Sequence, residues 1–189
     1  MELYLENGYT SLNKKGEELC GDKVECVVDG EYTTMVLADG MGSGVKANIL
    51  STLTSKILCT MVSNGIDMDE CIATIVSTLP VCKVRGVAYS TFSVIHVDKQ
   101  GKGFLFEFDN PAAIYYHHGK CCDFDRDEHA YAGKTIYVTR LNLEEDDVII
   151  IMSDGVIHAG IGQLLNFGWL RSDVMKYLDE EIKPEMSAR

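Results

Sequence analysis

The sequence of 189 residues has no long apolar run and few basic residues. No apolar stretch reaches the roughly 18 residues that a membrane-spanning helix needs. Seventeen lysines and arginines stand against 29 aspartates and glutamates, which gives a formal net charge of -12. Because such a charge repels nucleic-acid phosphates and anionic lipid headgroups, we expect neither nucleic acid nor a membrane among the partners.

The sequence also lacks a Cys-x-x-C pair and a secretory signal at its N-terminus. Its seven cysteines are an odd number and are scattered along the chain. These features favour reduced thiols in a cytoplasmic protein over a disulfide framework. The adjacent Cys121 and Cys122 could be redox-active, but small apolar filler or exposed loop thiols explain the whole set better.

Several motifs of known hydrolases and nucleotide-binding proteins are missing as well. The sequence has no phosphate-binding cysteine loop, no G-x-S-x-G turn and no H-E-x-x-H motif. The glycine-rich segment 39–44 (Asp-Gly-Met-Gly-Ser-Gly) matches neither G-x-G-x-x-G nor G-x-x-x-x-G-K-[ST]. It precedes a predicted helix and could cradle an anion on free N–H groups. A nucleotide- or phosphate-binding domain that needs no metal is therefore a further alternative, although the weaker one.

What the sequence does contain is typical of one globular domain. Hydrophobic residues make up 46% of the chain and charged residues 24%, and the length suffices for a sizeable core. We therefore interpret residues 1–189 as a single domain. Paired strands come first, then two helices, then further antiparallel strands, an order typical of an α+β fold. The predicted architecture is a pair of facing antiparallel β-sheets flanked by helices, an αββα sandwich.

Local signals predict the individual elements. Asp29-Gly30 predicts a hairpin turn. Residues 1–12 alternate loosely and predict an edge strand, the segment 88–117 predicts a meander, and the acidic segment 123–128 predicts a charged loop. The predicted strands are 1–12, 22–28, 33–38, 88–97, 103–108, 112–117, 135–141 and 147–152, and the predicted helices are 45–64, 68–79 and 172–182.

Two aspartates follow near-continuous apolar strands. Asp39 comes after Met-Val-Leu-Ala and Asp154 after Val-Ile-Ile-Ile-Met-Ser, and a glycine follows each. Carboxylates delivered to one edge of a sandwich stay ionised only when hydrogen bonds or cations compensate their charge. Hard divalent cations provide that compensation, and glycine lets the backbone approach them closely. A single Asp-Gly is more often an ordinary β-turn, which is how we interpret Asp29-Gly30.

Several motifs stand in the order found in one known family. They are Gly21-Asp22, Leu37-Ala-Asp-Gly-Met-Gly-Ser-Gly44, Phe108-Asp-Asn-Pro-Ala112 and Met152-Ser-Asp-Gly155. With them the chain resembles the metal-dependent protein phosphatase superfamily (protein phosphatase 2C-like), and most of all its bacterial stage II sporulation protein E (SpoIIE) branch. The resemblance implies two Mn²⁺ or Mg²⁺ ions that share Asp39. The backbone carbonyl of Gly40 and the carboxylate of Asp22 would complete one metal site, and Asp154 would serve the other.

The resemblance also implies a reaction. The two ions would hold a bridging hydroxide that attacks a phosphoserine or phosphothreonine in line, with Asp39 and Asp154 as the catalytic aspartates. The implied substrate is a phosphorylated regulatory protein. Whether the chain forms a homo-oligomer is left open by the sequence.

One departure from the family concerns the C-terminus. Family members carry a further aspartate, usually in an Asp-Asp-x-Thr segment on a last strand, and this chain reaches Arg189 before such a segment. We therefore expect a domain truncated at its C-terminal end, with its last strand missing. The missing ligand is the best support for the main alternative, a catalytically silent phosphatase-fold sensor or interaction module.

Five further residues are weaker candidates. Arg85, beside Gly86, and Asn110 could contact the substrate phosphate, although a surface arginine and a rigid turn are the alternative interpretations. His158 could lie near the site, or be a hydrogen-bonded structural histidine. His117-His118 stands at a predicted hairpin tip and could bind a metal adventitiously, although an exposed loop is the better explanation.

Overall fold

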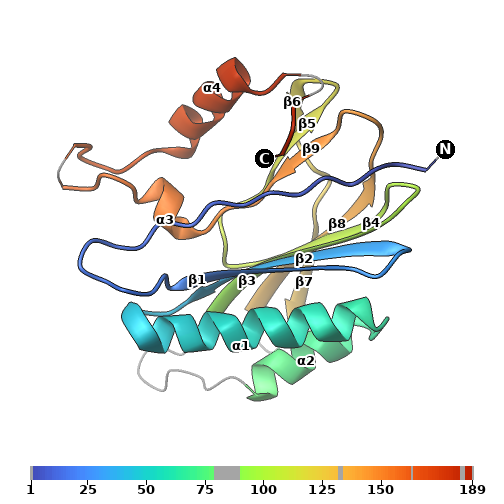
Figure 1. The fold of residues 1–189 in the computed structure, drawn as a ribbon, viewed down its shortest axis with the longest axis horizontal. Coiled ribbons are helices and arrows are strands. Elements are labelled where there is room, and N and C mark those ends of the chain that lie inside the picture. Colours follow the sequence, from blue (N-terminus) through green and yellow to red (C-terminus); the bar gives the residue numbers. More distant parts are fainter. Residues whose placement is uncertain (1, 79–89, 132–133, 163, 184–185, 189) are drawn as a thin grey trace.

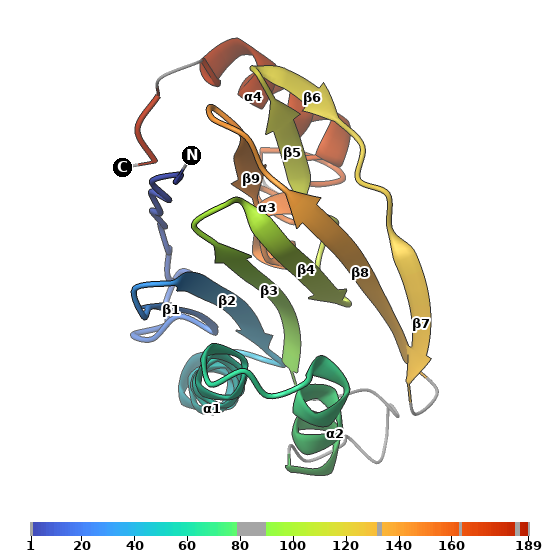
Figure 2. The same cartoon turned by 90° about the vertical axis from the view of Figure 1, so that its right-hand side faces the viewer.

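The computed structural model describes residues 2–78, 90–131, 134–162, 164–183 and 186–188. Its strands form two antiparallel sheets, and Figure 2 shows the strands of the larger sheet side by side. The six-stranded sheet contains, in spatial order, β1 (Asp22–Val28), β2 (Tyr32–Gly40), β3 (Ser90–Asp98), β4 (Lys102–Phe108), β8 (Lys134–Asn142) and β7 (Asp127–Tyr131). The three-stranded sheet contains β6 (Lys120–Cys122), β5 (Ile114–His117) and β9 (Val148–Ile150). The helices of the described residues are α1 (Gly44–Ser63), α2 (Met68–Thr78), α3 (Asp154–Ile157) and α4 (Arg171–Glu181).

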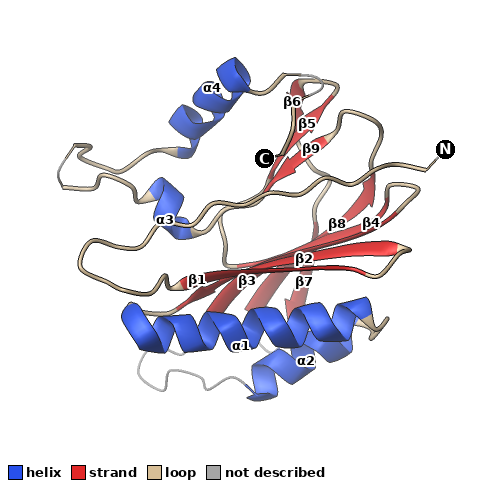
Figure 3. Cartoon of the chain, viewed as in Figure 1, coloured by secondary structure: helices blue, strands red, loops and turns tan. Residues whose placement is uncertain are grey.

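The elements stack in the order helices, sheet, sheet, helix (Figures 1 and 3). α1 and α2 cover one face of the six-stranded sheet, and the three-stranded sheet faces the other. α4 packs on the outer side of the small sheet, where Val174 joins Ile114 and Tyr116 in a buried cluster. This arrangement confirms the predicted αββα sandwich.

One face of the long helix α1 packs on the six-stranded sheet. Leu58 and Val62 belong to a buried cluster that includes residues of β2, β3 and β4. Apolar residues also lie on the opposite face of this helix, where Val45, Ile49 and Leu53 are 62%, 53% and 48% exposed. Within the described residues, no helix combines the length and the apolarity that crossing a membrane requires.

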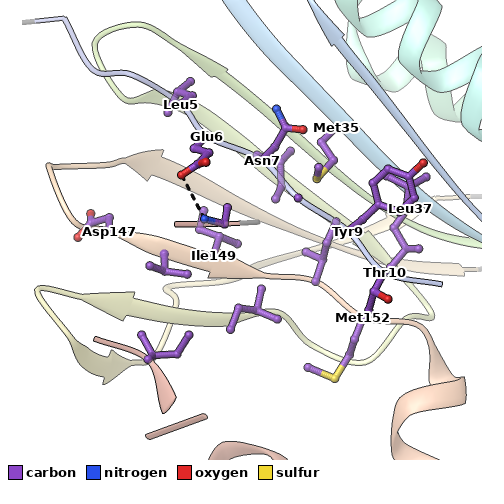
Figure 4. A pocket seen from close by; sticks show the side chains of 18 of the residues that line it. Leu5, Glu6, Asn7, Tyr9, Thr10, Met35, Leu37, Asp147, Ile149 and Met152 are labelled. Atoms are coloured by element: carbon purple, nitrogen blue, oxygen red, sulfur yellow. Dashed lines mark hydrogen bonds between the residues drawn. The ribbon is translucent and has the colours of Figure 1, made fainter. Parts of the chain in front are cut away.

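Apolar side chains from the two sheets meet in a second cluster, which contains Val97, Leu105 and Leu141 of the large sheet and Ile149 of the small one. A cavity of about 1340 Å³ also lies between the sheets. Met35 lines it from β2, and Ile149 lines it from β9 (Figure 4). The facing sheets therefore enclose both packed core and open space.

The N-terminal segment differs from the prediction of an edge strand. Residues 2–12 form no strand, and they run along the cavity between the sheets (Figure 1). Their hydrogen bonds go to separate partners: the N–H of Leu3 donates to the carbonyl of Lys99 at 2.6 Å, and Glu6 accepts from the hydroxyl of Ser187 at 2.8 Å. The alternating sequence thus gives an extended segment without the continuous pairing of a sheet ladder.

Two other predictions need correction. The three strand signals in 88–117 do not form one meander, because β3 and β4 lie in the large sheet and β5 lies in the small one. The segment interpreted as a charged loop overlaps β7, an edge strand that pairs with β8. Charged side chains are common on edge strands, and this polarity concealed β7 in the sequence.

Candidate metal centre

Three aspartates from separate parts of the chain meet beside the turn into α1. Asp22 in β1 stands opposite Asp39 in β2, and directly opposed residues of antiparallel strands share one face. Asp154 begins α3 just after β9, and the hydroxyl of Ser153 before it donates a hydrogen bond to Asp22 Oδ2 at 2.6 Å. The negative charges of Asp22 and Asp154 both raise the pKa of Asp39. The structure therefore brings the three predicted carboxyls into one cluster.

The carboxyl of Asp39 lies in an unusual environment. Burial, followed by the charges of Asp22 and Asp154, raises the pKa of Asp39 from 3.8 to about 8. The hydroxyl of Ser153 is neutral, so it cannot balance the negative charge that the three carboxyls carry when all of them are ionised. Clustered oxygen donors with excess negative charge fit hard divalent cations such as Mg²⁺ or Mn²⁺.

Glycines let the chain turn sharply from β2 into α1. Gly42 and Gly44 have φ angles of 105° and 65°, a left-handed conformation that favours glycine. A Cβ atom at Gly40 would lie 2.0 Å from the carbonyl oxygen of Ala47, so α1 packs directly on the end of β2. The N–H of Gly40 donates to the carbonyl of Gly21 at 3.1 Å. This bond holds the two strands together next to both of their aspartates.

Strand β3 supports the centre from the other side. Ser90 Oγ donates to the carbonyl oxygen of Asp39 at 2.8 Å. Asn110, a predicted substrate contact, is bound at both ends of its amide: Thr91 Oγ1 donates to Oδ1 at 2.5 Å, and Nδ2 donates to Ser93 Oγ at 3.0 Å. These bonds fix the loop after β4 against β3, next to the strand that carries Asp39.

Of the other predicted residues, Asp154 and His158 lie at the exposed edge of the cluster. The side chain of Asp154 is 61% exposed, and His158 Nε2 lies 4.0 Å from its Oδ2 atom. His158 is therefore at the solvent-facing rim of the cluster. Arg85 lies outside the described residues.

Sequence reasoning overlooked Ser153 and Ser90, which support the aspartates. Ser153 had a signal, because it directly precedes Asp154 in the Ser-Asp-Gly motif. Ser90 had no local signal, since it reaches the centre only through the pairing of β2 with β3, where it stands opposite Gly40.

Comparison with solved structures identifies similar folds. The PP2C phosphatase domain with a fragment of the regulatory domain of SpoIIE from Bacillus subtilis has a TM-score of 0.70 at 19% identity, over 95% of this chain and 52% of that chain. The RsbU and RsbW domains of a Mycobacterium tuberculosis protein have a TM-score of 0.66 at 17% identity, over 89% of this chain and 48% of that chain. RsbX in complex with magnesium has a TM-score of 0.58 at 21% identity, over 90% of this chain and 84% of that chain. This chain thus spans about half the length of the first two.

A comparison with curated proteins found no match. The similarity to the three solved structures, at 17% to 21% identity, establishes a shared fold, which agrees with the αββα arrangement described above. A family model, "Stage II sporulation protein E (SpoIIE)", matches residues 29–184 and so covers most of the chain. That segment includes Asp39 and Asp154, with their glycine neighbours. The chain belongs to the SpoIIE family.

Proposed function

We propose that residues 1–189 form the catalytic domain of a metal-dependent phosphatase that hydrolyses phosphoserine or phosphothreonine in proteins. The observation that carries this proposal is the convergence of Asp22, Asp39 and Asp154 beside the glycine turn into α1. Membership of the SpoIIE family and the shared fold with a PP2C phosphatase domain support it.

Each aspartate has a distinct proposed role. Asp39, the most central of the three, would be shared by two Mn²⁺ or Mg²⁺ ions, and its proton would leave when they bind. Asp22 and the carbonyl of Gly40 would complete one site, and the exposed Asp154 would serve the other. When bound, the ions would lower the pKa of a water molecule and stabilise charge on the phosphoryl oxygens. The magnesium complex of RsbX, which has the same fold, supports such a centre.

The proposed substrate is a phosphorylated regulatory protein. One of the similar folds occurs in a protein with RsbU and RsbW domains, and another in work on the bacterial stressosome. We propose Arg85 and Asn110 as contacts of the substrate phosphate. Because β3 already binds both ends of the Asn110 amide, that residue would act by positioning its loop unless the amide exchanges partners.

The test is hydrolysis of p-nitrophenyl phosphate and of a phosphoserine peptide, with and without Mn²⁺. We expect manganese-dependent turnover that Asp39→Asn removes while the circular dichroism spectrum stays unchanged. Asp29→Asn is the matched control, because Asp29 is also followed by glycine but caps the β1–β2 hairpin, where Asn can accept the same backbone bonds. Equal turnover in Asp39→Asn and wild type would contradict the assignment.

A second outcome distinguishes the silent module. If Mn²⁺ raises the melting temperature of the wild type but not of Asp39→Asn, and neither protein turns over, the metal centre is right and the catalytic proposal is wrong. The chain extended past Arg189 should then be assayed in the same way. Turnover in that longer protein alone would assign the activity to residues beyond this chain together with the centre.

A further inference from the structure

A second group of metal-binding side chains lies apart from the aspartate cluster. His117 ends β5, His118 stands in the turn to β6, and Glu144 lies in the segment between β8 and β9. One ligand atom from each of the three residues lies within 4.8 Å of the others. His118 Nε2 and Glu144 Oε2 are 3.3 Å apart, and the two imidazole rings have centroids 4.2 Å apart.

The buried side chain of Asp147 organises this group. It is 1% exposed, and its Oδ1 atom lies 2.7 Å from His117 Nδ1. Its Oδ2 atom accepts hydrogen bonds from the hydroxyl of Tyr115 at 2.7 Å and from the N–H of Glu144 at 2.8 Å. A single carboxylate therefore holds the ring of one histidine and the backbone of the glutamate.

This arrangement is the one that metal-binding histidines usually show. A histidine that binds a metal through one ring nitrogen commonly donates from the other to a carboxylate, which sets the tautomer and the ring orientation. Here Asp147 occupies Nδ1 of His117, so Nε2 is the nitrogen left for a metal. The predicted exposed loop at His117-His118 does not explain why a buried carboxylate should orient it.

We propose that His117, His118 and Glu144 bind Zn²⁺ or a similar borderline transition-metal ion, with water in the fourth position. Two imidazoles and a carboxylate with one open position are a known zinc ligand set. Imidazole donors favour such ions, whereas the oxygen-only aspartate cluster favours Mg²⁺ or Mn²⁺. The two centres therefore differ in metal preference.

The two centres also differ in position. Asp147 directly precedes β9, and Asp154 follows it, so they stand at opposite ends of this strand. Zinc at the histidine site would join the β5–β6 turn to the segment between β8 and β9. Binding to the folded state alone should raise the melting temperature, by about 5 °C or more at a hundredfold excess over the dissociation constant.

The test is a zinc titration of the whole chain by calorimetry in buffer with millimolar Mg²⁺, which competes for oxygen sites but poorly for imidazoles. We expect one zinc per chain. His118→Asn and Glu144→Gln should each weaken it at least tenfold. Asparagine suits position 118 because His118 has a φ of 47°, a value that asparagine tolerates. Both side chains are more than half exposed, so neither change should unfold the protein.

Two control variants separate this site from other zinc binding. His129→Ala removes an exposed histidine of β7 outside the group, and Asp39→Asn alters the aspartate cluster. Both variants should keep the wild-type zinc affinity.

Asp147→Asn tests whether Asp147 positions His117, and it should lower the zinc affinity roughly 10–100-fold. Tyr115→Phe provides a milder change if Asp147→Asn fails to fold. The proposal is overturned if wild type and the double variant His118→Asn/Glu144→Gln bind zinc equally, or if Asp39→Asn alone abolishes binding.

Discussion

The protonation of Asp39 should make the stability of the metal-free protein fall as pH rises. Burial and the charges of Asp22 and Asp154 raise the pKa of Asp39 from 3.8 to about 8. Between these two values the folded chain keeps a proton that the unfolded chain has released. Because the unfolded state binds fewer protons in this window, the free energy of unfolding decreases with rising pH. The stabilisation is fully present below pH 4 and is lost as pH passes through 8.

The size of this effect follows from the position of Asp39. A fully buried carboxyl would lose ~1.4 kcal/mol of stability for each pH unit in the window. Asp39 is partly exposed, and water and salt screen its repulsion from the neighbouring carboxylates, so we expect a total loss of roughly 2 kcal/mol. For a domain of this length, that loss corresponds to ~4–8 °C in melting temperature.

The substitution Asp39→Asn isolates this contribution, because asparagine resembles the protonated carboxyl at every pH. In EDTA, the variant should melt at nearly the wild-type temperature at pH 5 and ~4–8 °C above it at pH 8. Mn²⁺ added at pH 8 should stabilise the wild type and leave the variant unchanged. Asp29→Asn controls for the loss of one negative charge, and it should give no gain at pH 8, because backbone N–H groups of Tyr32 and Glu31 lower the pKa of Asp29.

Thermal unfolding followed by circular dichroism at several pH values measures these differences. An Asp39→Asn variant that is no more stable than wild type at pH 8 would refute the reasoning. So would an equal gain at pH 5 and pH 8, since that gain could not come from the charge of Asp39.

Two further substitutions test the packing that supports the centre. Gly40→Ala should destabilise the fold by more than ~2 kcal/mol, because the new Cβ would meet the backbone of Ala47 at 2.0 Å. The control Gly155→Ala, whose new Cβ has its nearest contact at 3.6 Å, should change the unfolding free energy by less than ~0.5 kcal/mol. Equal losses of stability for the two variants in urea denaturation would contradict the close packing at Gly40. Glu107→Ala should cost ~3 kcal/mol, because this buried carboxylate accepts from the N–H of Ala113 at 2.6 Å and lies 3.0 Å from Arg126. A urea midpoint close to that of the wild type would show that neither interaction contributes.

A large share of the fold could be predicted from the sequence, because local sequence signals specify those elements. The hairpin at Asp29-Gly30, the long helix after Gly44 and the strands before Asp39 and Asp154 each follow from turn chemistry or periodicity within a few residues. The structure confirms these elements with small shifts in their ends. Edge strand β7 was not predicted because it begins with the charged residues Asp127 and Glu128. Residues 2–12 were predicted as a strand, but alternation alone does not provide a pairing partner.

The sequence by itself determined which residues could carry a metal centre, because an apolar strand, an aspartate and a glycine stand next to one another along the chain. Only the tertiary structure decided how those residues meet. The register of β1 with β2 sets Asp22 opposite Asp39, and Ser153 reaches Asp22 across 131 positions of sequence. The same holds for His117 and Asp147, which approach through the pairing of β5 with β9. Strand pairing depends on contacts between distant segments, and no local pattern encodes which strand becomes the neighbour of which.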